Sequence, residues 1–293
     1  MKLMLCLISS VAFADAIFDK QVAPPKARAL WAVTQDIDTP ESVYYDAGTD
    51  IFYVSNVAGA PDQKDGKGWI SKITVSKEGK ATNTKWVEGL DAPKGMRVHN
   101  GTLWVSNITS LVGIDLKDGK KTEIPIEGAK FLNDVAVAPD GRVFVSDTLS
   151  SSIYVVKDGK AEIFMQGKEL ESPNGLVVDG NKLLVAAWGL TTDFSTKTPG
   201  RMYSLDLKTK KKTLITKKPT ANMDGLEVEG DGNYLVSDWA KGTVFRISKK
   251  GTVTLLLDGF KGAADIAYVP SKSLLVVPRM GENQISAFEL TKG

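Results

Sequence analysis

Short apolar runs separated by Asp, Gly and Asn recur along the chain in six units of the same design. The units begin 39 to 53 residues apart, at Glu41, Lys94, Asn133, Asn174, Asp224 and Ala264. In each unit an apolar segment leads into a polar turn, such as Ala138-Pro139-Asp140-Gly141, and a second apolar segment follows the turn. Because Gly and Asn tolerate a positive φ in such turns, the pattern predicts six β-hairpins.

A third apolar segment follows every hairpin, and a fourth precedes each new unit. In the first unit these segments are Trp69 to Val75 and Thr84 to Glu88. Four antiparallel strands repeated at about 40 residues are typical of a β-propeller blade, and no long stretch shows the 3.6-residue period of a helix. The sequence therefore predicts an all-β, six-bladed β-propeller in one domain of residues 15–293, with blades over about residues 28–290. A pair of β-sandwiches is the alternative, which the regular period disfavours.

The two ends of the repeat complement each other. The sixth unit ends after its third strand, and only Thr291, Lys292 and Gly293 remain behind it. Arg28 to Gln35 precedes the first unit and resembles a fourth strand. We therefore expect the N-terminal strand to complete the last blade, which closes the ring and removes an exposed sheet edge.

The first 14 residues are typical of a secretory signal peptide. Lys2 precedes an apolar run, and Ala12-Phe13-Ala14 is a small-x-small cleavage pattern. Cleavage after Ala14 would remove Cys6, the chain's single cysteine, and leave a mature protein suited to an oxidising compartment. The sequence thus predicts a secreted or periplasmic protein. The alternative is a cytoplasmic protein with a frayed apolar N-terminus.

Composition excludes several classes of partner and chemistry. The chain has 37 Lys and Arg against 35 Asp and Glu, so a net charge of +2 gives no electrostatic reason to expect nucleic acid as a partner. No second run of 18 apolar residues exists, so we expect no membrane span. With one Cys and one His, the chain cannot form internal disulfides, thiolate zinc sites or two-histidine metal sites. The histidine, His99, lies in a predicted hairpin turn.

Polar residues begin five of the six predicted first strands. First strands line the central channel of a propeller, so Glu41, Lys94, Asn133, Asn174 and Asp224 should gather at one mouth of it. Polar side chains ahead of apolar strands are costly unless they are paired, hydrated or bound to an ion. Carboxylate and amide oxygens suit a hard divalent cation such as Ca²⁺, and no soft ligand accompanies them. The residues predict a cation site.

The contexts of these residues resemble the senescence marker protein, gluconolactonase and luciferin-regenerating enzyme family, with diisopropyl fluorophosphatase as a more distant relative. The matching segments are P-E-S-V-Y around Glu41, S-P-N-G-L around Asn174, M-D-G-L around Asp224 and L-N-D-V around Asn133. The resemblance covers the mature chain as a repeat, but its specific part is these four residues. It implies that Glu41, Asn174 and Asp224 bind one divalent cation, with Asn133 beside it in contact with the metal or the substrate.

Two residues depart from the family pattern. Phe131-Leu132 stands before the Asn-Asp pair, where lactonases of the family often carry a basic or other substrate-contacting residue. Lys94 also joins the ring of channel residues. Its ammonium would repel a cation if it pointed inward, or could neutralise Glu41 or Asp224 in place of a metal. Alternatively, its long side chain swings away.

The loops that leave the second strands should wall the mouth. They place Trp188, Trp239 and Arg279 there as candidate substrate-binding residues with Asn133, the alternative for each Trp being packing between blades. Asn56, Asn107 and Asp147 begin equivalent loops. Two loops, Asn56 to Gly68 and Gly189 to Gly200, are long and contain Gly and Pro, which is typical of lids.

Together these features predict a metal-dependent hydrolase that acts on a lactone or related small ester. In this hypothesis the cation polarises the substrate and orients a water, and Asp224 or Asp134 accepts the proton of that water. Lys94 would stabilise the developing oxyanion or, alternatively, anchor a substrate carboxylate. A propeller that binds a ligand or a protein partner without catalysis is the competing interpretation, because the fold hosts both roles.

Overall fold

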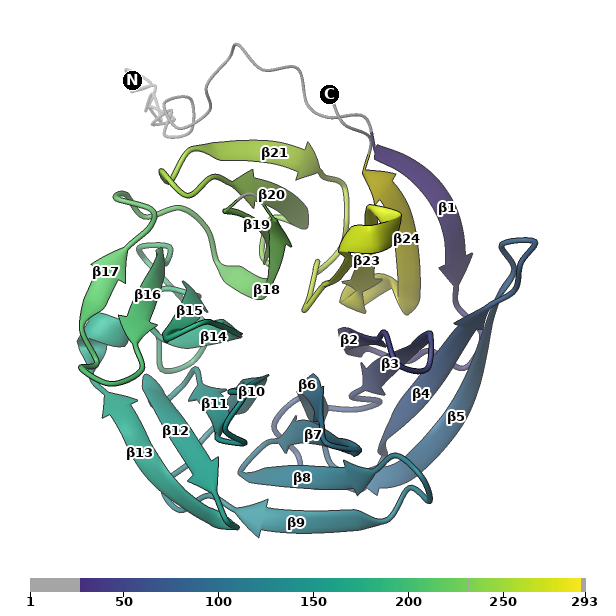
Figure 1. The fold of residues 1–293 in the computed structure, drawn as a ribbon, viewed down its shortest axis with the longest axis horizontal. Helices are drawn as coiled ribbons and strands as arrows, with labels where there is room; N and C mark the ends of the chain where they lie inside the picture. The colour runs from purple at the N-terminus through teal and green to yellow at the C-terminus, as the bar shows by residue number, and fades with distance from the viewer. Residues whose placement is uncertain (1–26, 231, 291–293) are drawn as a thin grey trace, which may run out of the picture.

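The computed structural model describes residues 27–230 and 232–290, which form six four-stranded antiparallel sheets arranged in a ring (Figure 1). The prediction of a six-bladed β-propeller is confirmed. The signal peptide predicted at residues 1–14 lies outside the described residues. Within the described part of the chain, no helix is long and apolar enough to cross a bilayer.

In blades one to five the strands run outward from the channel in chain order. Blade one contains β2 (Pro40–Asp46), β3 (Ile51–Asn56), β4 (Gly68–Val75) and β5 (Ala81–Leu90). Blade two contains β6 (Pro93–His99), β7 (Thr102–Asn107), β8 (Ser110–Asp115) and β9 (Lys121–Pro125). Blade three contains β10 (Leu132–Val137), β11 (Val143–Asp147), β12 (Ser152–Lys157) and β13 (Lys160–Gln166).

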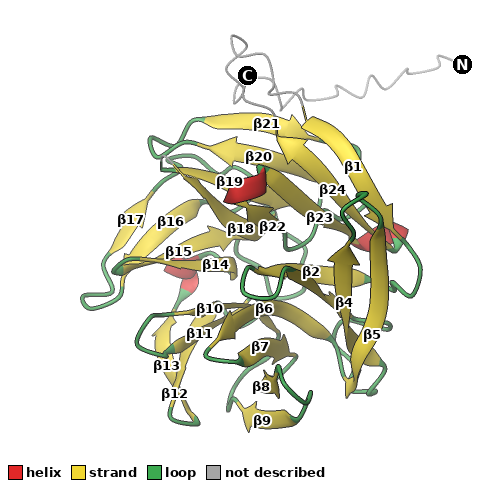
Figure 2. Ribbon diagram, turned by 45° about the vertical axis from the view of Figure 1, so that its right-hand side comes forward, coloured by secondary structure: helices red, strands yellow, loops and turns green. Residues whose placement is uncertain are grey.

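The remaining blades follow the same plan, with three short 3₁₀ helices in their loops (Figure 2). Blade four contains β14 (Pro173–Asp179), β15 (Lys182–Ala187), β16 (Met202–Asp206) and β17 (Lys212–Leu214). Blade five contains β18 (Met223–Gly230), β19 (Asn233–Asp238), β20 (Thr243–Ile247) and β21 (Val253–Leu257). The helices of the described residues are η1 (Lys168–Leu170), η2 (Pro270–Lys272) and η3 (Met280–Glu282).

Blade six joins the two ends of the described chain, as the sequence predicts. Its strands are β22 (Ala267–Val269), β23 (Leu274–Arg279), β24 (Gln284–Leu290) and, on the outside, β1 (Ala27–Val33). β1 pairs antiparallel with β24, and Arg28 forms an exposed ion pair with Glu289 at 2.7 Å. The N-terminal strand thus covers the edge that β24 would otherwise expose.

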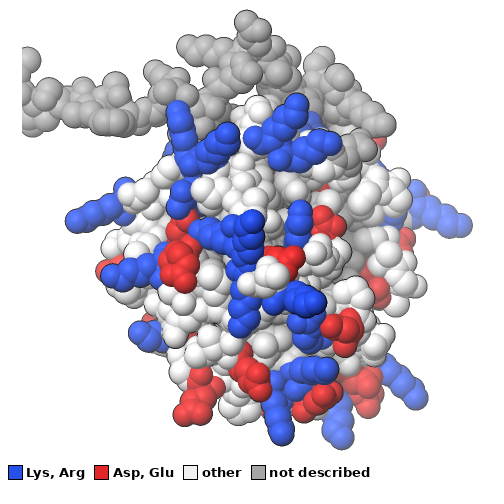
Figure 3. All heavy atoms as spheres, turned by 60° about the vertical axis from the view of Figure 1, so that its left-hand side comes forward, with Lys and Arg blue, Asp and Glu red and all other residues white. Residues whose placement is uncertain are grey.

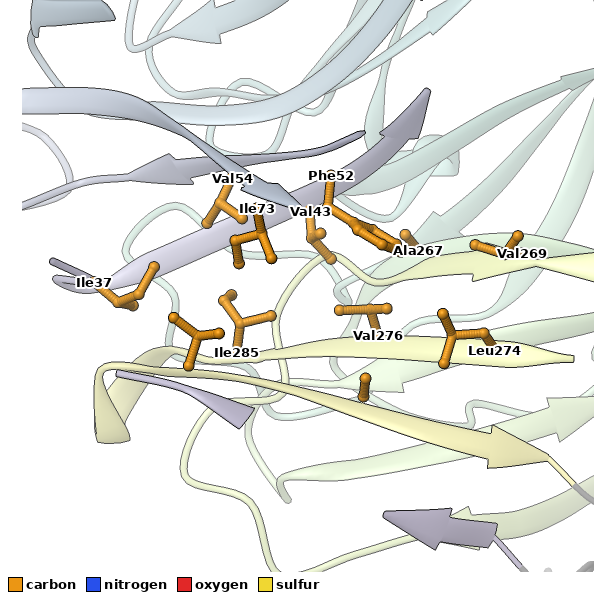
Figure 4. Packing of buried hydrophobic residues seen from close by; sticks show 12 residues of the cluster. Ile37, Val43, Phe52, Val54, Ile73, Ala267, Val269, Leu274, Val276 and Ile285 are labelled. Atoms are coloured by element: carbon orange, nitrogen blue, oxygen red, sulfur yellow. The ribbon is translucent and has the colours of Figure 1, made fainter. Parts of the chain in front are cut away.

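The hydrophobic core is divided among the junctions between blades. Each of the six large apolar clusters of the described residues joins two neighbouring blades. Figure 4 shows the junction that closes the ring, where Phe52 and Val54 of blade one face Val276 and Ile285 of blade six. Because every blade buries both of its faces, the apolar strands stack around the channel and hold the inner strands in place.

The five inner strands that carry a polar channel residue are irregular at that residue. The pairing register of β2, β6, β10, β14 and β18 with the second strand shifts across Glu41, Lys94, Asn133, Asn174 and Asp224, respectively. Such bulges re-aim a side chain and leave backbone groups without ladder partners. The five polar side chains are therefore displaced from the regular alternation of the sheet.

Serines on the second strands bind the backbone groups that the bulges release. Ser146 accepts a hydrogen bond from the Asp134 N–H at 2.9 Å and donates to the Asn174 carbonyl of the next blade at 2.7 Å. Ser237 bonds in the same way to Gly225 N–H at 2.7 Å and to the Ala264 carbonyl at 2.8 Å. These hydroxyls tie one inner strand to the next.

The polar residues that end the second strands have a structural role instead of the expected place in the mouth wall. Asn107 accepts hydrogen bonds from the N–H groups of Asp91 and Ala92 at 3.0 and 3.1 Å. Asp147 accepts from Lys130 and Phe131, and Asn56 accepts from Asp38. The sequence-based assignment of Asn56, Asn107 and Asp147 to the wall is wrong. Backbone N–H groups of the preceding loops donate hydrogen bonds to the side-chain oxygens of these residues.

We expect Ser146→Ala to lower the free energy of unfolding by about 1–3 kcal/mol, because it leaves a buried N–H and a buried carbonyl without partners. Urea unfolding followed by fluorescence measures the change. Ser204→Ala is the matched control, since Ser204 is buried on β16 and its hydroxyl makes no inter-blade hydrogen bond within the described residues. Equal stability of the two variants would contradict the inter-blade role of Ser146.

Candidate functional site

A cavity of about 480 Å³ opens at one mouth of the central channel. Its floor is formed by the channel residues of five different blades, Glu41, Lys94, Asn133, Asn174 and Asp224. None of these side chains is more than 4% exposed. The ring closure thus brings together the five polar residues that the sequence aligned, whereas Ala264 of blade six is buried and does not line the cavity.

Three oxygens at this floor have no hydrogen-bond partner among residues 27–230 and 232–290. They are Glu41 Oε2, Asn174 Oδ1 and Asp224 Oδ1, and each is closed off from solvent. A buried polar atom left unpaired costs about 1–3 kcal/mol, so three together on one cavity floor point to a group that binds there. Burial raises the pKa of both Glu41 and Asp224 well above the ordinary carboxyl value, and Asp224 raises that of Glu41 further.

Asn133 is oriented by the loop behind it. Its Nδ2 donates to Thr148 Oγ1 at 3.3 Å, and this hydroxyl in turn donates to the Pro173 carbonyl at 3.0 Å. Because the nitrogen is occupied, Oδ1 is the group of Asn133 that can bind a cation or a substrate donor. The amide therefore adds a further oxygen to the floor.

These donors fit a hard divalent cation. Two carboxylates and two amides supply oxygen ligands only. The three unpaired oxygens are inaccessible to a water molecule, whereas a bare metal ion is smaller and could coordinate them. No group of three or more His, Cys, Asp or Glu side chains is arranged around a metal position in the described residues. The floor therefore relies on its amides, and the remaining positions of a six- to eight-coordinate ion would fall to water or substrate.

Lys94 lies at the floor with its ammonium directed at backbone carbonyls. Nζ donates to Pro61 O and Ala92 O, both at 3.0 Å, and lies 4.2 Å from the centre of the Phe131 ring. It forms no ion pair with Glu41 or Asp224 within the part of the chain that the structure describes. Burial lowers the pKa of Lys94 to about 8, against the opposing effect of Glu41. Lys94 thus makes no direct ion pair with the carboxylates of the described residues, although Glu41 still acts on its pKa.

Asp134 and Asp265 lie beneath the floor and do not line the cavity. Asp134 accepts hydrogen bonds at 2.6 Å from the N–H groups of Val135 and Leu176. Asp265 accepts from Ser42 Oγ at 2.5 Å. The structure therefore places Asp134, which the sequence offered as an alternative proton acceptor, in backbone contacts between blades three and four.

The inner strands approach each other so closely here that two positions exclude a side chain. A Cβ on Gly95 would lie 2.2 Å from Asp134 Oδ1, and one on Gly175 would lie 2.2 Å from the Asp224 carbonyl oxygen. Glycine after Lys94 and Asn174 is therefore a packing requirement of the channel. It fixes the height at which the preceding polar side chain meets the cavity.

A partly buried ion pair spans the channel below this layer. Arg97 of blade two reaches Glu227 of the opposite blade five at 3.2 Å. Burial raises the pKa of Glu227 to about 7, although Arg97 acts to lower it. The positive charge of Arg97 also acts on Asp134 and Asp265, so this guanidinium compensates the acidic groups under the floor.

Aromatic side chains form the wall above the floor. Phe131 and Phe194 meet edge to face with ring centres 4.8 Å apart, Trp188 lies 5.5 Å from Phe194, and Trp239 lies 5.9 Å from Trp188. Both tryptophans line the cavity, as the sequence predicts. Pro61 and Phe194 show that the two long loops contribute to the wall as well.

Arg279 does not line the cavity. Its guanidinium forms two hydrogen bonds of 2.6 Å with Glu282 and packs against Phe260. Instead, the neighbouring Met280 lines the cavity and accepts a hydrogen bond from Trp239 Nε1 at 3.3 Å. Sequence analysis missed Met280 and Asn222 as lining residues. The available sequence signal was their position, one residue after Arg279 and two residues before Asp224.

The described residues also line larger and shallower hollows away from the channel. A groove of about 700 Å³ lies on the other side of the Gly189–Gly200 loop. Its charged residues Glu171 and Arg201 are already paired at 2.7 Å, and no buried polar atom without a partner lines it. Figure 3 shows acidic and basic side chains interspersed over this side of the ring. The channel cavity is therefore the better candidate site.

No family model and no curated protein matches the chain. A solved gluconolactonase from Xanthomonas campestris matches 96% of this chain and 99% of its own, at 16% identity and a TM-score of 0.68. Virginiamycin B lyase from Staphylococcus aureus matches 90% of this chain and 99% of its own, at 14% identity and a TM-score of 0.61. A chain of a nidogen/laminin complex matches 74% of this chain and 88% of its own, at 12% identity and a TM-score of 0.60. The resemblance to gluconolactonase-like propellers is confirmed at the level of the fold.

The raised carboxyl pKa values predict how stability depends on pH. Above about pH 4.5, the folded protein retains protons on Glu41 and Asp224 that the unfolded chain releases. Because the folded state then binds more protons, these groups lower the free energy of unfolding as the pH rises. With a chelator present, we expect Asp224→Asn to gain stability relative to the wild type as the pH rises above about 5, because the raised pKa of Asp224 is removed.

Urea unfolding at several pH values measures this difference. The control is Asp179→Asn, which removes an exposed carboxylate at the far end of β14. We expect its stability relative to the wild type to stay constant over the same interval. A constant difference for Asp224→Asn too would show that burial does not raise the pKa of Asp224 in the cation-free protein.

Proposed function

We propose that the chain is a divalent-cation-dependent hydrolase of a small lactone or related ester, with its active site in the channel cavity. The observation that carries the proposal is the convergence of three unpaired, buried oxygens from Glu41, Asn174 and Asp224 on the floor of that cavity. Oxygen-only donors favour Ca²⁺ as the cation. The predicted leader peptide suits this choice, because it would export the protein to a secreted or periplasmic location.

Each floor residue has a distinct part in the proposed reaction. Glu41, Asn174 and Asp224 would hold the cation, which supplies Lewis acidity toward the ester oxygen and a position for water. Asp224 accepts a proton from the attacking water, because its carboxylate lines the cavity. Asn133 offers its oxygen to the substrate or the cation from the neighbouring blade.

Lys94 would stabilise negative charge that develops on the substrate. An ammonium has three N–H donors, and the carbonyls of Pro61 and Ala92 occupy two of them. The third donor remains for an oxyanion at the floor. The two anchored hydrogen bonds fix the position of Nζ before substrate binds, which avoids the cost of ordering a long side chain during the reaction.

The similar structures support hydrolysis more than the chemistry of the lyase. The Staphylococcus aureus lyase is inactive when one histidine is replaced by alanine. The only histidine of this chain, His99, ends β6 in a hairpin turn and does not line the cavity. The gluconolactonase likeness, together with the floor of oxygen donors, therefore guides the proposal.

A binding propeller without catalysis is the second candidate. Trp239 is 38% exposed at the cavity rim, and a partly exposed aromatic residue is typical of sites that receive a ligand or a protein partner. A chain of the nidogen/laminin complex shares the fold. Turnover of an ester or lactone separates the two candidates.

We expect Ca²⁺ at about 100 times its Kd to increase the free energy of unfolding by about 2.7 kcal/mol. Thermal unfolding with and without a chelator measures this effect, and a panel of lactones and esters measures turnover. Asp224→Ala should abolish the Ca²⁺ effect and lower kcat/KM by at least about 100-fold, since it removes both a ligand and the proton acceptor.

Asp179→Asn serves again as the control, because its carboxylate is exposed and outside the cavity. It should keep both the Ca²⁺ effect and turnover. If Asp224→Ala retains both properties, the assignment of the site is wrong. Stabilisation by Ca²⁺ without turnover of any ester would favour the binding propeller.

A further inference from the structure

We propose that the channel cavity takes a lactone or ester that carries an aryl or alkyl group, and discriminates against polyhydroxylated sugar lactones. This inference rests on the proposed function, which it extends to the class of substrate. It is carried by the wall of the cavity above the oxygen floor. Its volume of about 480 Å³ lies in the range of pockets that enclose a small molecule.

The wall is apolar on several sides. Its side chains come from Pro61, Phe131, Trp188, Phe194, Trp239, Ala240 and Met280. An aryl or alkyl group that enters this space leaves water and contacts aromatic faces, which is favourable by about 25 cal/mol for each Å² of apolar surface buried. The wall therefore favours binding of a substrate that carries an apolar substituent.

The aromatic residues support one another in a continuous series. Phe131 contacts Phe194, Phe194 contacts Trp188, and Trp188 contacts Trp239, all with ring centres less than 6 Å apart. Asn222 Nδ2 donates to the Trp188 carbonyl at 2.9 Å and to Thr196 Oγ1 at 2.8 Å, which ties the Gly189–Gly200 loop to the wall. An already ordered wall binds an apolar group without a large ordering cost.

The polar groups of the wall are largely occupied by the protein itself. Asn222 uses its Nδ2 as described, and Trp239 Nε1 donates to Met280 Sδ at 3.3 Å. Among the described lining residues, Trp188 Nε1 is the one buried donor that lacks an acceptor. One donor matches the single spare carbonyl or ether oxygen of a simple ester, but not the several hydroxyls of a sugar lactone. Hydroxyls stripped of water without new partners oppose binding.

The cationic side chains near the cavity are also bound to the protein, and the donor that remains is the third N–H of Lys94, at the floor. Arg279 pairs with Glu282 outside it, and Lys94 donates to two backbone carbonyls. Phe131 presents a ring beside Lys94 at the position that precedes Asn133 and Asp134. The wall thus offers no free guanidinium to hold a sugar acid.

The experiment compares γ-nonalactone and phenyl acetate with glucono-δ-lactone, using the full-length protein with Ca²⁺. We expect kcat/KM for the two apolar substrates to exceed that for the sugar lactone by at least about 100-fold. Trp239→Ala should raise KM for the apolar substrates about 10-fold with kcat within about twofold, since it removes wall surface remote from the floor. Trp239→Phe should restore most of the loss.

Trp86→Ala is the matched control, because Trp86 is a half-buried tryptophan on β5 that does not line the cavity. Binding is measured separately through quenching of tryptophan fluorescence by an alkyl-substituted lactam, which resembles the lactone but resists hydrolysis. We expect this lactam to bind the wild type and Trp86→Ala alike, and Trp239→Ala about 10 times more weakly.

The outcomes separate this inference from the proposed function. Lactam binding that depends on Trp239, without hydrolysis of any ester, would remove the proposed function and retain the apolar ligand class. Turnover of glucono-δ-lactone above that of both apolar substrates would overturn the inference while hydrolysis stands. Lactam binding unchanged in Trp239→Ala would also overturn it.

Discussion

The close approach of neighbouring inner strands around the channel controls the rest of this structure. At Gly95 and Gly175 the next blade leaves no space for a Cβ, and buried serines such as Ser146 bridge one inner strand to another. The close contact coincides with the bulges in the inner strands of blades one to five, and a bulge re-aims the side chain that it carries. Oxygens from separate blades consequently meet on one floor without freedom to turn outward and find water.

The same close approach brings several carboxylates together in the channel, and the protein compensates their charges differently at two depths. Arg97 and Glu227 pair across the channel, and the positive charge of Arg97 offsets Asp134 and Asp265 above them. At the floor, Lys94 is committed to carbonyl groups, so Glu41 and Asp224 keep unpaired oxygens. Asp134 accepts two backbone hydrogen bonds and Asp265 accepts one from Ser42, although Asp265 Oδ1 has no partner among the described residues. The unpaired oxygens of Glu41 and Asp224 differ in that their side chains line the cavity, where a bound group can reach them.

The cavity joins two environments that favour different parts of one ligand. Its floor presents oxygens suited to a hard cation, and its wall presents aromatic faces from Phe131, Phe194, Trp188 and Trp239. A gluconolactonase and a virginiamycin B lyase share the fold at 16% and 14% identity, so the fold leaves open which substrate enters. The chemistry of the wall supplies that selectivity in our interpretation.

The sequence by itself determined the six blades, the closure by the N-terminal strand and the oxygen donors at the channel, because hairpin turns and strand periodicity are local signals repeated at a regular spacing. It did not determine where Lys94 and Arg279 point, that Asp134 lies beneath the floor, or that Asn107 binds backbone. Those outcomes depend on which groups of other strands lie within reach of each side chain. Met280 and Asn222 entered the wall for the same reason: only closure of the ring brings their loops beside Trp239 and Trp188.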